Sequence, residues 1–170
     1  MSIAVHSTLR RAALAAALAF GALAGVPAIA EPLTPEKAAE QAGVAKRFYS
    51  LINGGDAAQW RTVFADGWKA TPPLPSKPNE VGGYEAVIGG FRAGFPDLKV
   101  EQLEIIANED VVAVRSRVTG TNTAQLFGQP ATNKAVAFTA MDIHRVKDGR
   151  IVETWHVEDY TTMQRQLAGK

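Results

Sequence analysis

Carboxylate and imidazole side chains gather near the C-terminal end of the sequence, on either side of the pair Asp148-Gly149. Asp142 and His144 precede this pair, and Asp159 follows it. Carboxylates and imidazoles are the groups that exchange protons near neutral pH in general acid–base catalysis. The chemistry that this segment offers is therefore proton transfer, provided that the fold brings the three side chains together.

Two adjacent strands are predicted here, because Asp-Gly between segments rich in β-branched and aromatic residues indicates a hairpin with a two-residue turn. Such a turn pairs Lys147 with Arg150. Cross-strand partners share one face of a sheet, and so do alternate residues of a strand. The face that follows from this pairing consists of Phe138, Ala140, Asp142, His144, Val146, Ile151, Glu153, Trp155, Val157 and Asp159.

This face is the more apolar of the two, so we expect it to pack against helices. Its titratable groups then predict a polar-lined pocket rather than a dry core, because burying such groups without partners is costly. The opposite face carries His156 and Glu158, and a surface or interface role is expected for His156. The assignment depends on the register, since a shift of one residue moves every side chain to the other face.

Each candidate residue has a functional and a structural interpretation. Asp159 is either a general acid–base or a strand-end aspartate that caps the terminal helix. Asp142 and His144 form either an orienting pair in the pocket or a part of the core near the turn. The aromatic candidates are either ligand contacts or core residues, and they are Trp60, Trp68, Phe91, Phe127, Phe138 and Trp155.

The composition excludes several classes of site. The sequence has no cysteine, which removes disulfides, cysteine nucleophiles and thiolate metal ligands. It has no H-E-x-x-H motif and no glycine-rich phosphate loop, so neither a metal nor a cofactor is expected. No basic or basic-aromatic stripe is present, which argues against nucleic acid as a partner.

The first 30 residues have the pattern of a secretory signal peptide. Arg10 and Arg11 precede an apolar stretch over 12–24, and Ala28-Ile29-Ala30 matches a cleavage site. We expect a periplasmic or secreted domain over 31–170 with no stable membrane insertion after cleavage; the alternative is an uncleaved membrane anchor. Without the signal, the formal charge changes from +1 to −1.

The periodicity of the remaining chain predicts an α+β domain. Helices are expected from Thr34 to Asn53, from Asp56 to Asp66 and over 84–94, with a short strand over 68–71. Strands are expected over 98–107, 111–121, 135–146 and 151–159, and a last helical turn over 163–167. Helices followed by a meander of strands favour an antiparallel sheet with its helices gathered on one side.

Several motifs in this order are typical of one family: Phe95-Pro96-Asp97-Leu98, Gly120-Thr121, the segment 144–155 and Gln166-Leu167. Together they resemble the SnoaL-like polyketide cyclases, also called ester cyclases, of the nuclear transport factor 2-like superfamily. The resemblance implies a cone-shaped, strongly curved antiparallel sheet (a cystatin-like fold) that, with three N-terminal helices, encloses a pocket. It also implies that Asp159 matches the general acid–base of an intramolecular aldol closure, and that a homodimer forms through the outer sheet face.

Two function classes follow. The first is a cofactor-free cyclase, isomerase, hydrolase or dehydratase that acts on a small apolar or aromatic molecule through Asp159, with His144 as a second group. The second is a non-catalytic periplasmic binding module or a dimeric interaction module of the same fold.

Overall fold

The computed structural model describes residues 33–126 and 128–170. The predicted secretory signal over 1–30 lies outside the described residues, and so does Phe127. Within the described part of the chain, no helix is long and apolar enough to cross a membrane.

Helix α1 (Pro35–Ile52) begins and ends where its sequence signals predict. The Thr34 hydroxyl accepts a hydrogen bond from the amide of Lys37, and Pro35 occupies the first turn. Asn53 is the C-cap, and its side chain bonds both the amide and the carbonyl of Val100. Asp56 caps a short helical pair, η1 (Ala57–Gln59) and α2 (Trp60–Val63).

The five strands form one sheet in the order β1-β5-β4-β3-β2. They are β1 (Phe64–Thr71), β2 (Lys99–Asn108), β3 (Val111–Thr121), β4 (Ala135–Lys147) and β5 (Arg150–Glu158). The four later strands pair antiparallel, as predicted, whereas β1 pairs parallel with β5. The sheet is therefore mixed, because the first strand returns to the edge of the meander.

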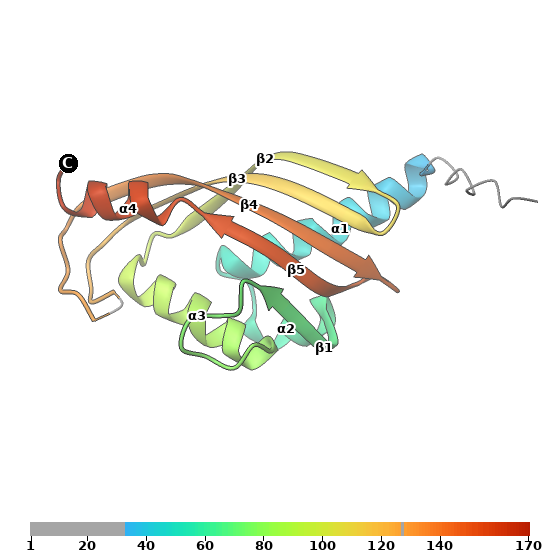
Figure 1. Cartoon of the computed structure of the whole chain (residues 1–170), viewed down its shortest axis with the longest axis horizontal. Coiled ribbons are helices and arrows are strands. Elements are labelled where there is room, and N and C mark those ends of the chain that lie inside the picture. The colour runs from blue at the N-terminus through green and yellow to red at the C-terminus, as the bar shows by residue number, and fades with distance from the viewer. Residues whose placement is uncertain (1–32, 127) are drawn as a thin grey trace, which may run out of the picture. The chain divides into compact units, whose positions relative to one another are not determined.

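Helices α1, α2 and α3 (Val81–Gly94) lie on one side of the sheet, and α4 (Tyr160–Leu167) follows β5 at the end opposite the β4–β5 turn (Figure 1). The layer between helices and sheet is the hydrophobic core, whose largest fully buried side chains include Phe48, Tyr49, Phe64 and Trp68. The α+β architecture with a curved, open sheet confirms the predicted fold class.

The register of the β4–β5 hairpin differs from the prediction beyond its first two pairs. Lys147 faces Arg150 as expected, across a turn whose Asp148 and Gly149 both have positive φ. A bulge then follows, and Arg145 pairs with Glu153 instead of facing Val152. A bulge adds one residue to one strand, so every residue of β5 beyond it lies on the face opposite to the predicted one.

The bulge corrects half of the predicted inner face. Asp142 and His144 of β4 are buried on the helix side, as expected. On β5, however, Glu153, Trp155 and Val157 belong to the outer face, and Thr154, His156 and Glu158 take their places inside.

Candidate active site

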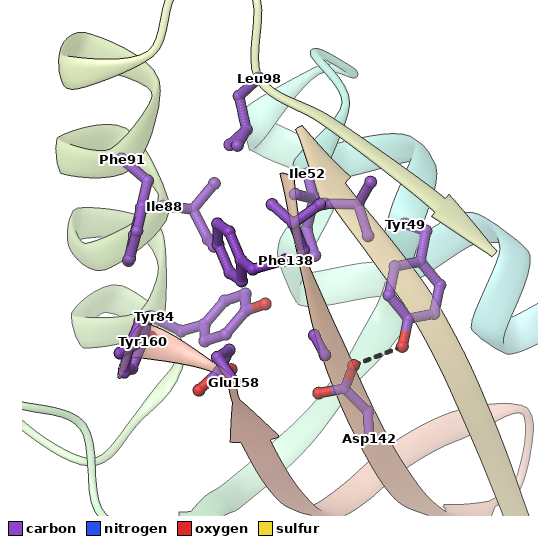
Figure 2. Close-up of a pocket in the computed structure, with 13 residues that line it drawn as sticks. Tyr49, Ile52, Tyr84, Ile88, Phe91, Leu98, Phe138, Asp142, Glu158 and Tyr160 are labelled. Atoms are coloured by element: carbon purple, nitrogen blue, oxygen red, sulfur yellow. Dashed lines mark hydrogen bonds between the residues drawn. The ribbon is translucent and has the colours of Figure 1, made fainter. Parts of the chain in front are cut away.

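A small cavity lies between the inner face of the sheet and helices α1, α3 and α4 (Figure 2). It has a volume of about 70 Å³. Its polar side chains come from two tyrosines on the helices, a tyrosine at the start of α4 and two carboxyl groups on the sheet. The lining residues are Tyr49, Ile52, Tyr84, Ile88, Phe91, Leu98, Val100, Val118, Phe138, Ala140, Asp142, Glu158 and Tyr160.

A second hollow of about 60 Å³ adjoins this cavity beside the loop that joins β1 to α3. The two share Tyr84, Asp142, Glu158 and Tyr160 among other lining residues. Leu74 and Pro75 of the loop complete the second hollow. The carboxyl groups therefore stand at the junction of two apolar spaces.

Asp142 is the buried acid of the cavity. Tyr49 Oη donates a hydrogen bond of 2.6 Å to its Oδ2 atom. Burial raises the pKa of Asp142 to about 6, and Glu158 contributes to the increase, while the Tyr49 bond and His156 oppose it. A carboxyl group with a pKa near neutrality can both accept and release a proton under ordinary conditions.

Glu158 is held by His156, two residues earlier on the same strand. His156 Nδ1 lies 3.0 Å from Glu158 Oε1, and Nε2 lies 3.1 Å from the carbonyl oxygen of Pro72. A carbonyl oxygen and a carboxylate both accept hydrogen bonds, so both ring nitrogens donate and the imidazole is protonated. The bond to Glu158 accordingly raises the pKa of His156.

Three tyrosines complete the polar lining. Burial raises the pKa of Tyr49, Tyr84 and Tyr160 above the ordinary value for tyrosine. Each hydroxyl therefore stays protonated at neutral pH, and that of Tyr49 donates its hydrogen bond to Asp142. Figure 2 shows the side chain of Tyr84 reaching from α3 toward the middle of the lining residues.

Asp159 does not line the cavity, so its predicted place on the pocket face is wrong. It is exposed, and its Oδ1 accepts a hydrogen bond of 2.9 Å from the amide of Thr162 as the N-cap of α4. This bond lowers the pKa of Asp159. Of the two interpretations of Asp159, the structure supports the helix cap.

Trp155 is also misplaced by the prediction, for the same reason. It lies on the outer face of β5, where the guanidinium of Arg145 stands 5.5 Å from its ring centroid. The bulge between the turn and Glu153 carries Trp155 to this side of the sheet.

His144 is a core residue rather than a cavity group. It is 0% exposed, and its Nδ1 lies 3.1 Å from Thr154 Oγ1, which also accepts a bond from Trp68 Nε1. Its ring packs against that of Phe48. Burial lowers the pKa of His144 to about 3, so the imidazole is neutral throughout the physiological range.

The remaining aromatic candidates divide between core and cavity. Phe91 and Phe138 line the cavity, as predicted, and Trp68 lines the adjoining hollow. Trp60 packs in the core, stacked on Phe64. Phe127 is outside the described residues.

Sequence reasoning did not identify Tyr49, Tyr84, Glu158, His156 and Tyr160 as site residues. Tyr84 begins the helix predicted over 84–94 and could have been chosen as an aromatic residue with a polar end. Glu158 and His156 were placed on the outer face, because the alternation of residues in β5 carries no signal for the bulge.

Among residues 33–126 and 128–170, no group of three or more His, Asp or Glu side chains could hold a metal ion. The expectation that the site needs no cofactor stays a prediction.

Comparisons with known proteins agree on one family. The sequence profile of the SnoaL-like polyketide cyclases matches residues 42–167. No curated protein matches the chain. Among solved structures, a candidate polyketide cyclase from Bacillus cereus ATCC 10987 is 29% identical, with a TM-score of 0.70 over 80% of this chain and 85% of that one.

Two further structures extend this likeness. IdmH, a candidate polyketide cyclase from Streptomyces antibioticus, is 29% identical with a TM-score of 0.64, over 75% of this chain and 98% of its own. A SnoaL-like protein from Jannaschia sp. CCS1 is 18% identical with a TM-score of 0.68, over 78% and 94% of the two chains, and shows the shared fold alone.

Proposed function

The chain belongs to the SnoaL-like polyketide cyclase family, and on that premise we propose that it is a cofactor-free enzyme of the cyclase or isomerase type. Its general acid–base is Asp142 rather than Asp159. The observation that carries this proposal is the 2.6 Å hydrogen bond from Tyr49 to Asp142 at the wall of a largely apolar cavity.

Asp142 has the position and the proton affinity for the task. In its ionised form it takes a proton from an acidic C–H or O–H group of the substrate, and it returns a proton to the product. Tyr49 holds one carboxyl oxygen, which fixes the orientation of the group relative to the cavity. Tyr84 supplies a neutral hydroxyl that can donate a hydrogen bond to an oxygen where negative charge develops.

The volume of the cavity limits the substrate. Sites for drug-sized ligands typically have volumes of roughly 300–1,000 Å³, whereas this cavity has about 70 Å³. We therefore propose a small substrate whose apolar or aromatic part fills this space, with room for a substituent in the adjoining hollow.

The test begins with the protein purified from its own host. Native mass spectrometry of the whole protein identifies a co-purified ligand, and its turnover is then measured with Asp142→Asn and Asp159→Asn. The proposal predicts a loss of about 10²-fold or more in kcat for Asp142→Asn and an unchanged kcat for Asp159→Asn. Full turnover by Asp142→Asn would contradict the assignment.

A non-catalytic binding module is the second candidate. It is favoured by the exposure of Asp159, the residue to which the family resemblance assigns the acid–base role. Under this alternative the captured ligand binds in the cavity and is recovered unchanged after incubation with the wild-type protein.

We also propose export and dimerisation. The signal-like segment supports export, and N-terminal sequencing of the periplasmic or secreted protein is expected to begin at Glu31. The outer face of the sheet supports a homodimer, because Met141, Ile143 and Val157 are 52%, 43% and 62% exposed there.

A further inference from the structure

We propose that the cavity binds a positively charged small molecule, a substituted ammonium ion, in preference to a neutral or anionic molecule of the same shape. The inference rests on the proposed function, because it names the ligand class of the same cavity. Its basis is the combination of two carboxyl groups, aromatic walls and the lack of a basic side chain among the described lining residues.

The charged groups that line the cavity are all acidic. Asp142 and Glu158 are its ionisable carboxyl groups, and no lysine, arginine or histidine is among its described lining residues. The adjoining hollow adds one base, His156, which is bound to Glu158 through Nδ1 and to the Pro72 carbonyl through Nε2. No basic group in the described lining is therefore left to bind the carboxylate or phosphate of an anionic ligand.

The walls offer ring faces and edges on several sides. The rings of Phe91 and Tyr160 are stacked with their centroids 6.2 Å apart. The ring centroid of Phe138 lies 6.4 Å from that of Tyr160. Tyr49 and Tyr84 complete the aromatic part of the lining (Figure 2). Aromatic faces attract organic cations through the ring quadrupole, and aromatic cages are a recurrent way to bind quaternary ammonium groups.

The charge balance also favours a cation. The His156 imidazolium compensates the charge of Glu158, so ionised Asp142 leaves the cavity with one uncompensated negative charge. The hydrogen-bond partner of the Asp142 carboxyl group, among residues 33–126 and 128–170, is the neutral hydroxyl of Tyr49. A bound ammonium ion would supply the missing positive charge, and the carboxyl proton would leave as the ion enters.

Binding should then depend on pH. The titratable groups that face Asp142 are Tyr49 from α1, Tyr84 from α3, His156 and Glu158 from β5 and Tyr160 from α4. The tyrosines stay neutral, because burial raises their pKa values. A rise in pH removes protons from Asp142 and later from His156. Both changes make the charge of the cavity more negative and therefore favour the binding of a cation.

The experiment uses choline and its neutral isostere dimethylbutanol, in which a carbon atom replaces the nitrogen. Binding to the full-length protein is measured by calorimetry and by NMR shifts of the cavity aromatics. We expect choline to bind about tenfold or more tightly than the alcohol above pH 7, and its affinity to fall about tenfold per pH unit below pH 6, as expected for release of one proton.

Asp142→Asn should reduce the affinity for choline to that of the alcohol without changing alcohol binding, and Asp159→Asn should change neither. Equal or tighter binding of the alcohol to the wild-type cavity would overturn the cation preference and leave the proposed enzyme intact. Absence of binding by both probes would also overturn it, while the proposed function is decided separately by the ligand captured from the host.

Discussion

The hydroxyl of Tyr49 in helix α1 and the carboxyl group of Asp142 in strand β4 are joined by a buried hydrogen bond of 2.6 Å. The two residues are 93 positions apart in the sequence. The bond links the helical layer to the sheet at the wall of the cavity and favours the ionised form of a carboxyl group whose pKa is raised by burial. The acid–base chemistry proposed for this protein depends on this pair.

The pKa of Asp142 makes stability depend on pH. The folded state holds the proton up to about pH 6, whereas the unfolded chain releases it near pH 4. The stability that this proton affinity contributes is present below about pH 4 and is lost as the pH rises to about 6. Asparagine has no such proton to lose. The free energy of unfolding of Asp142→Asn should therefore rise relative to that of the wild type by up to about 3 kcal/mol as the pH increases across that interval. Urea unfolding of both proteins at several pH values measures the difference, and parallel curves would contradict it.

The imidazolium of His156 should be visible by NMR. Because Glu158 and Pro72 both accept hydrogen bonds from its ring, its pKa is expected above the ordinary value of about 6.5. The stability gained from its proton is complete below about pH 6.5 and disappears as the pH rises through the folded-state pKa. Glu158→Gln should lower the His156 pKa, whereas Glu153→Gln on the outer face should not. A His156 that titrates below about 6.5 in the wild type would contradict the hydrogen bonds to Glu158 and Pro72.

Asp159 should behave as a helix cap. Asp159→Asn keeps an oxygen that can accept from the Thr162 amide and should leave both stability and ligand binding unchanged. Asp159→Ala removes that acceptor and should lower stability slightly, with ligand binding intact. Chemical denaturation measures the effect on stability, and the choline titration measures the effect on binding. A loss of choline binding in a well-folded Asp159→Asn protein would show that Asp159 belongs to the binding site.

The outer face of the sheet should mediate dimerisation. On this face, Ile143 of β4 pairs with Trp155 of β5, and Met141 pairs with Val157. Ile143→Lys places a charge in this apolar surface and should give a monomer in light scattering, while Thr123→Lys in an exposed loop should not. A monomeric wild-type protein at high concentration would refute this interface.

Much of the fold was predictable because its local signals are strong. Three signals depend only on neighbouring residues, and each lies where it was expected. They are the start of α1 at Thr34-Pro35, its end at Asn53 and the turn at Asp148-Gly149. The parallel pairing of β1 with β5 was not predictable, because it depends on where the chain returns after α2.

The site was predicted only in part, for a specific physical reason. Asp142 and Phe138 line the cavity because the inner face of β4 follows from alternation alone, and Phe91 lines it from the buried stripe of α3. The inner face of β5 required the hairpin register, and the bulge before Glu153 reversed it. Asp159 was therefore assigned to the cavity in place of Glu158, one residue earlier.

The most direct test of the account is a carbon-13 NMR titration of the Asp142 carboxyl group, assigned with Asp142→Asn. The account predicts a midpoint near pH 6 in the wild type. In Tyr49→Phe the midpoint should be higher, because the hydrogen bond from Tyr49 favours the ionised form. A wild-type midpoint near pH 4, the ordinary value for an aspartate, would contradict the assignment of Asp142 as the acid–base group of the cavity.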